Sequence, residues 1–370
     1  MDRPSPIFVT RPVLPPLDDL LPLLDEIWQS RILTNRGPMV ERLEAALGAH
    51  LGVEHVSLVA NASLGLVLAL RHLGITGEVV TTPFSFAASG HAIRWAGAEP
   101  VFADIDPATL GLDPAAAAAR ITPRTRAILA VHCYGIPCDT AGLAALAAAH
   151  GIPVIYDAAH AFGITTPAGP LCAAGELSVL SLHATKVFNT FEGGAVIARD
   201  RAAKEAIDRL ANFGILDETS IPDTGLNGKM SELHAAVGLA LLPHIGAAIA
   251  ARAERARAYD AALRGIAGLR PLKVPAGILY NHYAYPVFVG PDYPLDRDGL
   301  WARLRGAGIL ARRYFHPLLS DLPMYRGLPS AAPGGLPAAR AAAAAVLCLP
   351  LYPDLAPEEQ ARITAILQDP

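Results

Sequence analysis

Cysteine is scarce in this chain of 370 residues, which contains four cysteines and no Cys-x-x-Cys pair. A chain of this length can bury a large apolar core and needs no disulfide bonds to hold its fold. We therefore expect reduced, buried cysteines, as in a cytoplasmic protein; they are Cys133, Cys138, Cys172 and Cys348. His132 lies beside Cys133 and near Cys138, but this cluster lacks the spacing of a zinc site, and we predict no metal.

Charged side chains and long apolar runs are also infrequent. Charged residues account for 17% of the chain and the formal net charge is −4, which argues against binding to a nucleic-acid backbone. No apolar run approaches the roughly 20 residues that a membrane-spanning helix requires. The start of the chain, Met1-Asp2-Arg3-Pro4, lacks the apolar character of a secretion signal. These absences predict a cytoplasmic protein with no membrane span and no nucleic-acid partner.

Short apolar runs alternate with segments of helix length as far as about residue 240. Thr140–His150 is one such segment, and Asp139 is placed to cap it. Strands that alternate with helices are typical of βαβ units, in which helices cover both faces of a mostly parallel sheet. The predicted fold class is therefore α/β, with strands expected at 79–82, 101–105, 127–131, 152–157, 177–182 and 195–198.

The character of the sequence changes after about residue 230. Ser231 to Leu263 has the composition of a long helix, which Pro243 would interrupt. The segment Tyr283–Val289 and the Pro- and Gly-rich connections around it indicate short strands. We therefore predict a large domain with an N-terminal arm over residues 1–240 and a smaller α+β domain over residues 241–370.

Two polar residues follow separate apolar runs, and together they suggest a cofactor. Asp157 ends the run that starts at Ile152, and Lys186 follows the run Leu177–Leu182. Taken singly, such a lysine is usually a solvated surface charge, and such an Asp is often a helix N-cap. Ligands of parallel sheets bind at the carboxyl ends of strands, where both residues fall. A lysine and a carboxylate in one cleft suit pyridoxal 5'-phosphate (PLP), since the lysine binds it covalently and the carboxylate keeps its pyridine nitrogen protonated.

Three other positions could contact such a cofactor. Asn61-Ala62-Ser63 opens a helical run whose free N–H groups suit a phosphate, although a plain N-cap explains the same residues. Ser181 could bind a phosphate, or it could be an ordinary buried strand serine. Pro83-Phe84-Ser85-Phe86 follows a strand, and an aromatic side chain there could stack on a cofactor ring, although most phenylalanines pack in the core.

Several longer motifs resemble the sugar-nucleotide aminotransferases of the DegT/DnrJ/StrS family, which have PLP fold type I. The motifs extend over nearly the whole chain and are highly specific when taken jointly. They are Ile32–Pro38, Val154–Gly163, Ser181–Lys186 with Glu192–Gly194, Asn227–Glu232, Arg313–Leu318 and Val346–Tyr352. The resemblance implies a PLP-dependent transferase with a mostly parallel sheet in its large domain and a smaller C-terminal domain.

The resemblance also implies roles for individual positions. Lys186 and Asp157 would be the catalytic pair, with Lys186 as the Schiff-base lysine. The cofactor contacts would be Ala62, Ser63, Phe86, Asp157, Ala159, His160, Ser181, Lys186 and, from the other subunit of a homodimer with shared sites, Asn227. The substrate contacts would be Lys229, Arg312, Arg313, Tyr314 and His316. The family often has Gly-Thr or Gly-Ser where this chain has Ala62-Ser63, a change that keeps the backbone N–H groups.

The segment around Lys186 implies where the amino group is transferred. His183-Ala184-Thr185-Lys186 followed by Glu192-Gly193-Gly194 resembles the members that act at C4 of the sugar, whereas C3-acting members have Tyr-Pro-x-Lys-Asn. The nearest resemblance is to enzymes that move the amino group of L-glutamate to dTDP-4-keto-6-deoxy-D-glucose, giving dTDP-4-amino-4,6-dideoxy-D-glucose. Pyridoxamine 5'-phosphate would be the cofactor form between the two half-reactions.

Three alternatives remain at this stage. The first is a 4-aminotransferase for a UDP- or GDP-linked 4-keto sugar. The second is a PLP-dependent sugar dehydratase, whose members carry His in place of the lysine found here as Lys186. The third is a non-catalytic regulator, against which the pairing of Lys186 with Asp157 argues.

Overall fold

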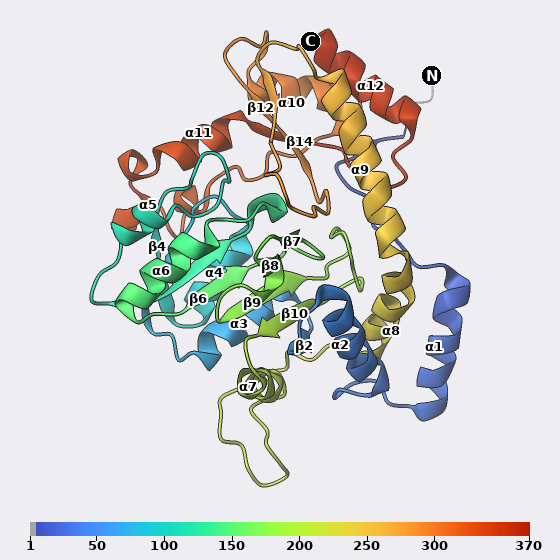
Figure 1. The fold of residues 1–370 in the computed structure, drawn as a ribbon, viewed down its shortest axis with the longest axis vertical. Coiled ribbons are helices and arrows are strands. Elements are labelled where there is room, and N and C mark those ends of the chain that lie inside the picture. Colours follow the sequence, from blue (N-terminus) through green and yellow to red (C-terminus); the bar gives the residue numbers. More distant parts are fainter. Residues whose placement is uncertain (1–4) are drawn as a thin grey trace.

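A seven-stranded sheet forms the centre of the computed structural model, which describes residues 5–370 (Figure 1). Its strand order is β2-β10-β9-β6-β5-β3-β4, and β10 runs antiparallel to both of its neighbours. The other adjacent pairs are parallel, which confirms the predicted α/β class. The strands are β2 (Val56–Val59), β3 (Gly77–Thr81), β4 (Ala98–Phe102), β5 (Thr125–Val131), β6 (Val154–Asp157), β9 (Leu177–Ser181) and β10 (Gly194–Ala198).

Helices cover both faces of this sheet, because successive side chains of a strand point to opposite faces. Val179 of β9 packs among residues of α3, α4 and α7 on one face. Its neighbour Leu180 packs among residues of α2 and α8 on the other face. Ala130 of β5 packs among residues of α6. The helices up to this point are α1 (Leu17–Ser30), α2 (Pro38–Leu51), α3 (Ala62–His72), α4 (Ala87–Trp95), α5 (Pro114–Ala118), α6 (Thr140–His150), α7 (Arg201–Ala211) and α8 (Glu232–Leu241).

The predicted helix caps are present. Oδ1 of Asp139 accepts the Gly142 N–H at 2.8 Å and begins α6 at the predicted residue. Oδ1 of Asn61 accepts the Leu64 N–H at 2.9 Å, and α3 begins at the next residue after Asn61. Both caps satisfy donors that the first turn of a helix leaves without an intrahelical partner.

One predicted strand is displaced. The sequence predicts residues 101–105, whereas β4 covers Ala98–Phe102. Its neighbour β3 ends at Thr81, which lies opposite Phe102, so later residues have no ladder partner in this sheet. Asp104 instead accepts the N–H groups of Ala338 and Ala339, at 2.8 Å each.

The C-terminal part is built on a long helical segment and a small sheet. Helices α8 and α9 (Ile245–Ala262) are joined by a short 3-10 turn, Leu242–His244, at the predicted proline. The run Glu232–Ala262 has the length and composition of a membrane span, but Val237 and Tyr259 along it are buried in two protein cores. The remaining elements are β11 (Leu269–Pro271), β12 (Tyr285–Val289), α10 (Arg297–Gly306), β13 (Ile309–Leu310), α11 (Pro337–Ala345), β14 (Val346–Leu349), α12 (Pro357–Gln368) and the short pair β7 (Thr165–Thr166) and β8 (Gly169–Pro170).

The N-terminal segment crosses to this C-terminal part. Strand β1 (Ile7–Phe8) pairs in parallel with β13, with Ile7 opposite Ile309, and Ile7 is buried in the core around β12 and β14. A second core contains Phe84 of the first half together with Phe288 of the second. The division near residue 240 stays a prediction, to which the structure adds that the first strand lies with the C-terminal elements.

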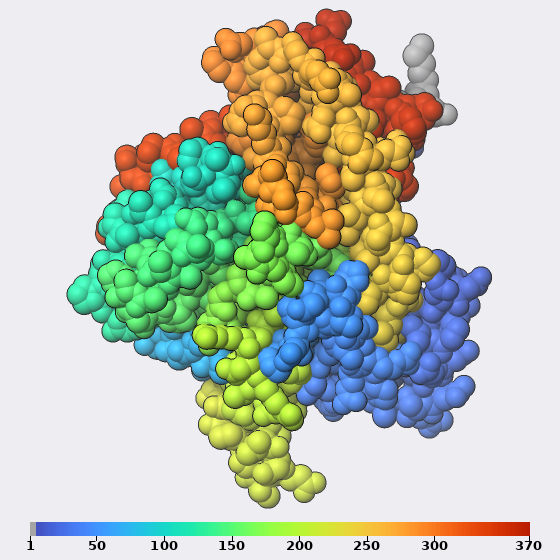
Figure 2. Space-filling model, in the orientation of Figure 1, coloured from blue at the N-terminus to red at the C-terminus, as the bar shows by residue number. Residues whose placement is uncertain are grey.

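A hairpin over residues 212–228 projects from the body of the molecule. It follows α7 and extends beyond the rest of the chain in both views (Figures 1 and 2). Its backbone pairs at Asn212 with Asn227 and at Asp217 with Ser220. Apolar side chains along it are exposed: Phe213 by 49%, Leu216 by 62% and Ile221 by 64%.

Candidate active site

Lys186 lies in a closed loop between β9 and β10. The loop is held at its base by the Leu182 N–H, which donates to the Gly193 carbonyl at 2.9 Å. Near Lys186 itself, the lysine N–H donates to the His183 carbonyl at 2.8 Å. The side chain is half-buried, and its Nζ lies 3.4 Å from the Tyr283 hydroxyl and 4.9 Å from the centre of that ring.

The surroundings of Lys186 change its protonation. Burial lowers the pKa of the amine from 10.5 to about 8, and the negative charge of Asp157 acts in the opposite direction. A lysine in this range is partly neutral near physiological pH. It can therefore act as a nucleophile and as a proton carrier, which an ordinary surface lysine cannot.

Asp157 ends strand β6, which is hydrogen-bonded to β9 on one side. The carboxylate is 6% exposed, and its Oδ2 accepts the Ser89 hydroxyl at 2.6 Å. Its Oδ1 accepts the Ala159 N–H at 3.1 Å. Burial raises the pKa of Asp157, while the hydrogen bonds from Ser89 and Ala159 and the charge of Lys186 lower it. The result is a fixed carboxyl group that can share a proton with a ring nitrogen.

His160 lies behind the lysine, against an aromatic ring. It is buried and stacks on Tyr283, with ring centres 4.1 Å apart and an interplanar angle of 14°. Its Nδ1 accepts the Tyr134 N–H at 3.1 Å, which assigns the proton to Nε2. Burial, together with the charge of Lys186, holds the pKa of His160 well below its usual range, so this ring is neutral.

The strand register brings the predicted phosphate contacts together. Gly194 at the start of β10 lies opposite Ser181 on one side and Val59 on the other, just before α3. A Cβ on Gly194 would lie 2.6 Å from the Ala62 nitrogen, so only glycine permits this close approach to the first turn of α3. The N–H groups of Ala62 and Ser63 belong to the first turn of α3, and Gly194 lies between this turn and Ser181. Their role as a phosphate site stays a prediction.

Phe86 and Ala159 are the two residues predicted to flank the cofactor ring, and both lie between Ser63 and Ser181 in the sequence. Phe86 precedes α4 and its side chain is 63% exposed, whereas its neighbour Phe84 is fully buried. An exposed aromatic side chain next to the helix that supplies Ser89 is well placed for stacking. The Ala159 N–H donates to the Asp157 carboxylate. Their roles against the ring stay predictions.

Asn227 and Lys229 lie at the base of the 212–228 hairpin. The side chain of Asn227 is exposed, while the carbonyl of Gly228 accepts the Ala60 N–H at 2.7 Å. Nζ of Lys229 donates to Asn212 Oδ1 at 2.7 Å and lies 4.6 Å from the centre of the Phe213 ring. Burial lowers the pKa of Lys229.

The predicted substrate residues after β13 are in different environments. Nη1 of Arg313 is 2.8 Å from Asp298 Oδ1, and its guanidinium lies 4.2 Å from the centre of the Trp301 ring. Arg312 and His316 are exposed, and the Tyr314 carbonyl accepts the Tyr134 hydroxyl. Arg313 is thus already engaged by Asp298 and Trp301, which leaves Arg312 as the more accessible cation of the pair.

Sequence reasoning missed two residues of this site. Ser89 binds Asp157 across 68 positions of sequence, and Tyr283 contacts Lys186 across 97 positions. The only local signal for Ser89 is its spacing from Ser85, one helical turn earlier, whose Oγ lies 2.7 Å from that of Ser89. Tyr283 stood in a predicted strand, but β12 begins two residues later, which leaves Tyr283 in the preceding segment at the site.

His132, Cys133 and Cys138, the cluster considered as metal ligands, are buried. Sγ of Cys138 lies 3.3 Å from Nδ1 of His132, and all four cysteines are buried and unpaired. Over residues 5–370 there is no group of three or more His, Cys, Asp or Glu side chains that could hold a metal ion.

A lysine of lowered pKa, a buried carboxylate on a neighbouring strand and a helix N-terminus beside them define the site of a PLP-dependent transferase. The residues fit the cofactor: Lys186 suits the covalent link, Asp157 the pyridine nitrogen, and the first turn of α3 with Ser181 the phosphate. Comparison with known proteins agrees with this class. The model of the DegT/DnrJ/EryC1/StrS aminotransferase family matches residues 18–368, and the chain belongs to this family of PLP-dependent sugar-nucleotide transaminases.

Named relatives span nearly the whole chain. A dTDP-4-amino-4,6-dideoxy-D-glucose transaminase of Shigella dysenteriae is 45% identical over 352 residues, which is 95% of each protein. The enzyme of the same name from Escherichia coli is 43% identical over 361 residues, 97% of each. Among solved structures, DesI in the presence of its TDP-sugar product matches with a TM-score of 0.94 and 37% identity, covering 100% of this chain and 93% of that one.

Proposed function

We propose that this enzyme transfers the amino group of L-glutamate to C4 of dTDP-4-keto-6-deoxy-D-glucose and so forms dTDP-4-amino-4,6-dideoxy-D-glucose. The observation that carries the proposal is the pairing of Lys186 with Asp157 in a chain that is 45% identical to a transaminase named for this product. The His183-Ala184-Thr185-Lys186 segment, which resembles C4-acting members, supports the same position of amination.

The residues of the site supply the proton transfers. When bound, PLP accepts the amino group of the donor and passes it to the ketone, with its ring as the electron sink. Lys186 removes a proton from the donor carbon and returns one to the acceptor carbon, which its pKa of about 8 allows. Asp157 holds a proton at the pyridine nitrogen, and the hydrogen bond from Ser89 keeps that carboxylate in place.

Substrate recognition requires cations for the diphosphate of the sugar nucleotide. We propose Lys229 and Arg312 for this role, with Arg313, Tyr314 and His316 as neighbouring candidates. Lys229 is supported by its place at the base of the hairpin beside Ala60, next to the first turn of α3. Arg312 is supported by its exposure, whereas Arg313 would first have to leave Asp298.

We further propose a homodimer in the cytoplasm with sites shared between subunits. The exposed apolar side chains of the 212–228 hairpin, such as Leu216 and Ile221, are those that a second subunit would cover. Asn227 at its base would then reach the cofactor phosphate of the partner. Buried, unpaired cysteines support a reducing compartment.

Other relatives mark the competing functions. A GDP-perosamine synthase of Vibrio cholerae is 30% identical over 309 residues, which favours a GDP-linked substrate as the second candidate. A protein of Geobacillus stearothermophilus named as a pleiotropic regulatory protein is 32% identical over 349 residues. The presence of Lys186 argues against a dehydratase, and its position near Asp157 argues against a non-catalytic regulator.

The first half of the reaction tests the proposal without the sugar. Adding L-glutamate to the purified, PLP-loaded protein should remove the visible absorbance of the bound cofactor and release one 2-oxoglutarate per site. The Lys186→Ala variant should show neither change. A spectrum unaffected by glutamate in the wild-type protein would reject the proposed amino donor.

A further inference from the structure

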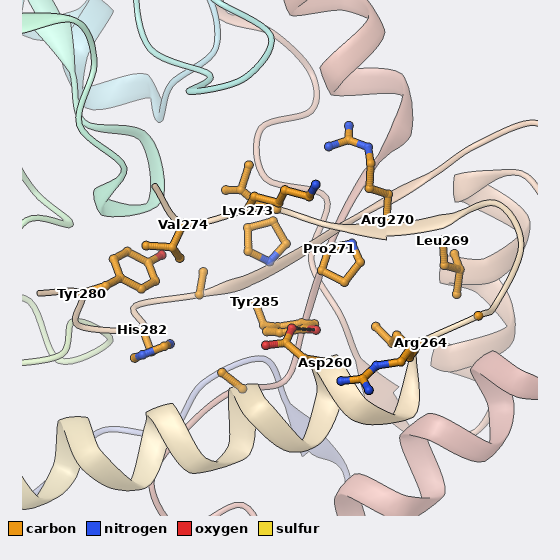
Figure 3. A pocket seen from close by; sticks show the side chains of 16 residues that line it. Asp260, Arg264, Leu269, Arg270, Pro271, Lys273, Val274, Tyr280, His282 and Tyr285 are labelled. Carbon is orange, nitrogen blue, oxygen red and sulfur yellow. Dashed lines mark hydrogen bonds between the residues drawn. The ribbon is translucent and has the colours of Figure 1, made fainter. Parts of the chain in front are cut away.

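A second concave site lies in the C-terminal part of the molecule. It is a pocket of about 680 Å³ between the end of α9 and strands β11 and β12 (Figure 3). Neither Lys186 nor Asp157 lines it. Its volume is in the range of pockets that hold small molecules of nucleotide size.

Cations outnumber carboxylates around this pocket. Arg264, Arg270 and Lys273 line it, and Asp260 is the acidic residue among the lining side chains. Oδ1 of Asp260 accepts the Tyr285 hydroxyl at 2.7 Å, so part of its hydrogen-bonding capacity is already used. Because the whole chain carries a net charge of −4, this pocket is a local reversal of charge that would attract an anion.

The groups that face His282 reinforce this positive field. Burial and the charges of Arg257 and Arg252 lower the pKa of His282, while Asp260 raises it. His282 is therefore neutral near pH 7, and its one N–H group can donate a hydrogen bond to a ligand. The guanidinium of Arg270 lies 4.5 Å from the centre of the Phe288 ring, which is not part of the pocket lining, so Arg264 and Lys273 are the lining cations left to face an anion.

The opposite end of the pocket is aromatic. In Figure 3, Tyr280 and His282 lie at one end, and Arg264 and Arg270 lie at the other. The Tyr280 and His282 rings are 5.0 Å apart, and the Tyr280 hydroxyl donates to the Tyr134 carbonyl at 2.8 Å. An aromatic pair at one end of the pocket, with its rings at 66° to each other, and cations elsewhere in the lining match a molecule that carries a base and a diphosphate.

The same short segment lines the pocket and the active site. We call residues 277–284 the strap. Tyr280 and His282 of the strap face the pocket, whereas Nδ2 of Asn281 donates to the carbonyl of His160 at 2.9 Å. Tyr283 stacks on His160, with its hydroxyl 3.4 Å from Lys186. Alternate residues of one segment thus serve two sites.

We propose that this basic pocket binds a nucleoside diphosphate as a second site and that its occupancy alters the environment of Lys186 through the strap. The binding rests on the pocket alone, while the effect on Lys186 also rests on the proposed function. A ligand that fixes Tyr280 and His282 restricts the segment that positions Tyr283. Two sites are coupled when a ligand at one of them favours one arrangement of a segment that also contacts the other.

Calorimetric titration of the PLP-loaded protein with dTDP tests the binding. The wild-type protein should bind one more dTDP per chain than the Arg264→Ala/Lys273→Ala variant. The matched control Arg71→Ala/Arg326→Ala removes two exposed arginines that do not line the pocket, and it should behave as wild type. Equal stoichiometry in all three proteins would overturn the site. If dTDP does not bind the active site, the wild-type protein should bind one dTDP per chain and the Arg264→Ala/Lys273→Ala variant none, so the difference of one remains.

The coupling is read from the pH titration of the visible absorbance of the bound cofactor. Saturating dTDP should shift its midpoint further in the wild type and the control than in the Arg264→Ala/Lys273→Ala variant. An identical shift in all three proteins would place the effect in the active site and overturn the coupling.

Discussion

At the scale of single residues, the site depends on Lys186, whose charged form is disfavoured by burial. Burial of Lys186 lowers its pKa, and the charge of Asp157 restores part of the loss. The carboxylate is in turn fixed by Ser89 and the Ala159 N–H. The charge of each group thus opposes part of the effect of burial on the pKa of the other.

The first prediction concerns pH. A lysine amine must be neutral to attack the PLP aldehyde, so incorporation of PLP into the cofactor-free protein should accelerate with pH and level off above about pH 8. Stopped-flow absorbance across the pH range measures this midpoint. Because the charge of Asp157 raises the pKa of Lys186, the Asp157→Asn variant should level off at a lower pH. A wild-type rate that still climbs steadily towards pH 10.5 would show that burial does not lower the pKa of Lys186.

The second prediction separates the carboxylate from its support. Asp157→Asn keeps the shape but cannot hold a proton at the pyridine nitrogen, so kcat should fall by at least about a hundredfold, or roughly 3 kcal/mol. Ser89→Ala removes one hydrogen bond and should lower kcat about tenfold, near the lower end of the roughly 1.5–3 kcal/mol that a hydrogen bond to a charged group contributes. Steady-state kinetics measures both losses. Near-normal turnover of Asp157→Asn with full PLP occupancy would contradict the assigned role.

The residues that the sequence predicted share one property. Lys186 and Asp157 follow apolar runs, and the strand-end rule places such residues at the ligand edge of a sheet. Ser89 and Tyr283 could not be found in this way, because their contacts arise only when α4 and the strap pack onto the sheet. Local sequence patterns predict strands and helix caps. The contacts of Ser89 and Tyr283 join residues far apart in the sequence, so no local pattern predicts them.

At the scale of elements, the phosphate end of the site is formed by close packing of β10 against α3. The antiparallel register of β10 places Gly194 between Ser181 and the start of α3. The sequence indicated the helix N-terminus through Asn61 and the strand through its apolar run. It did not indicate that β10 is antiparallel, since a buried strand has the same composition in either direction.

The third prediction tests that packing. In Gly194→Ala the new Cβ would lie 2.6 Å from the Ala62 nitrogen, so the first turn of α3 must shift. Overpacking of this kind costs about 1–3 kcal/mol, and PLP affinity should fall about ten- to a hundredfold. Gly246→Ala is the control, because a Cβ there meets nothing within 4 Å. Equilibrium dialysis gives the affinities, and equal PLP binding by the two variants would show that this contact does not shape the phosphate site.

At the scale of the whole molecule, the chain exposes a hairpin on which Leu216 and Ile221 are 62% and 64% exposed. The N-terminal strand β1 shows how segments of this fold cross between parts, since it pairs with β13. Neither feature was predicted from the sequence: β1 has two residues, and the hairpin has no strand pattern of its own.

The fourth prediction follows from shared sites. Lys186→Ala and Asn227→Ala should each be inactive alone, but a mixture of the two should recover up to about a quarter of wild-type activity, because half of randomly paired dimers carry one intact site. Subunit exchange is confirmed by differently tagged chains. Exchange without any recovery would show that Asn227 serves the site of its own subunit.

The central claim is the identity of the reaction, and one measurement tests it most directly. The purified enzyme is supplied with L-glutamate and, in parallel, with dTDP-, UDP- and GDP-linked 4-keto-6-deoxy sugars, and the products are analysed by NMR. We predict that dTDP-4-keto-6-deoxy-D-glucose is turned over with the highest kcat/KM and that the product carries its amino group at C4 in the gluco configuration. A higher kcat/KM for a UDP- or GDP-linked sugar, or amination at C3, would contradict the account.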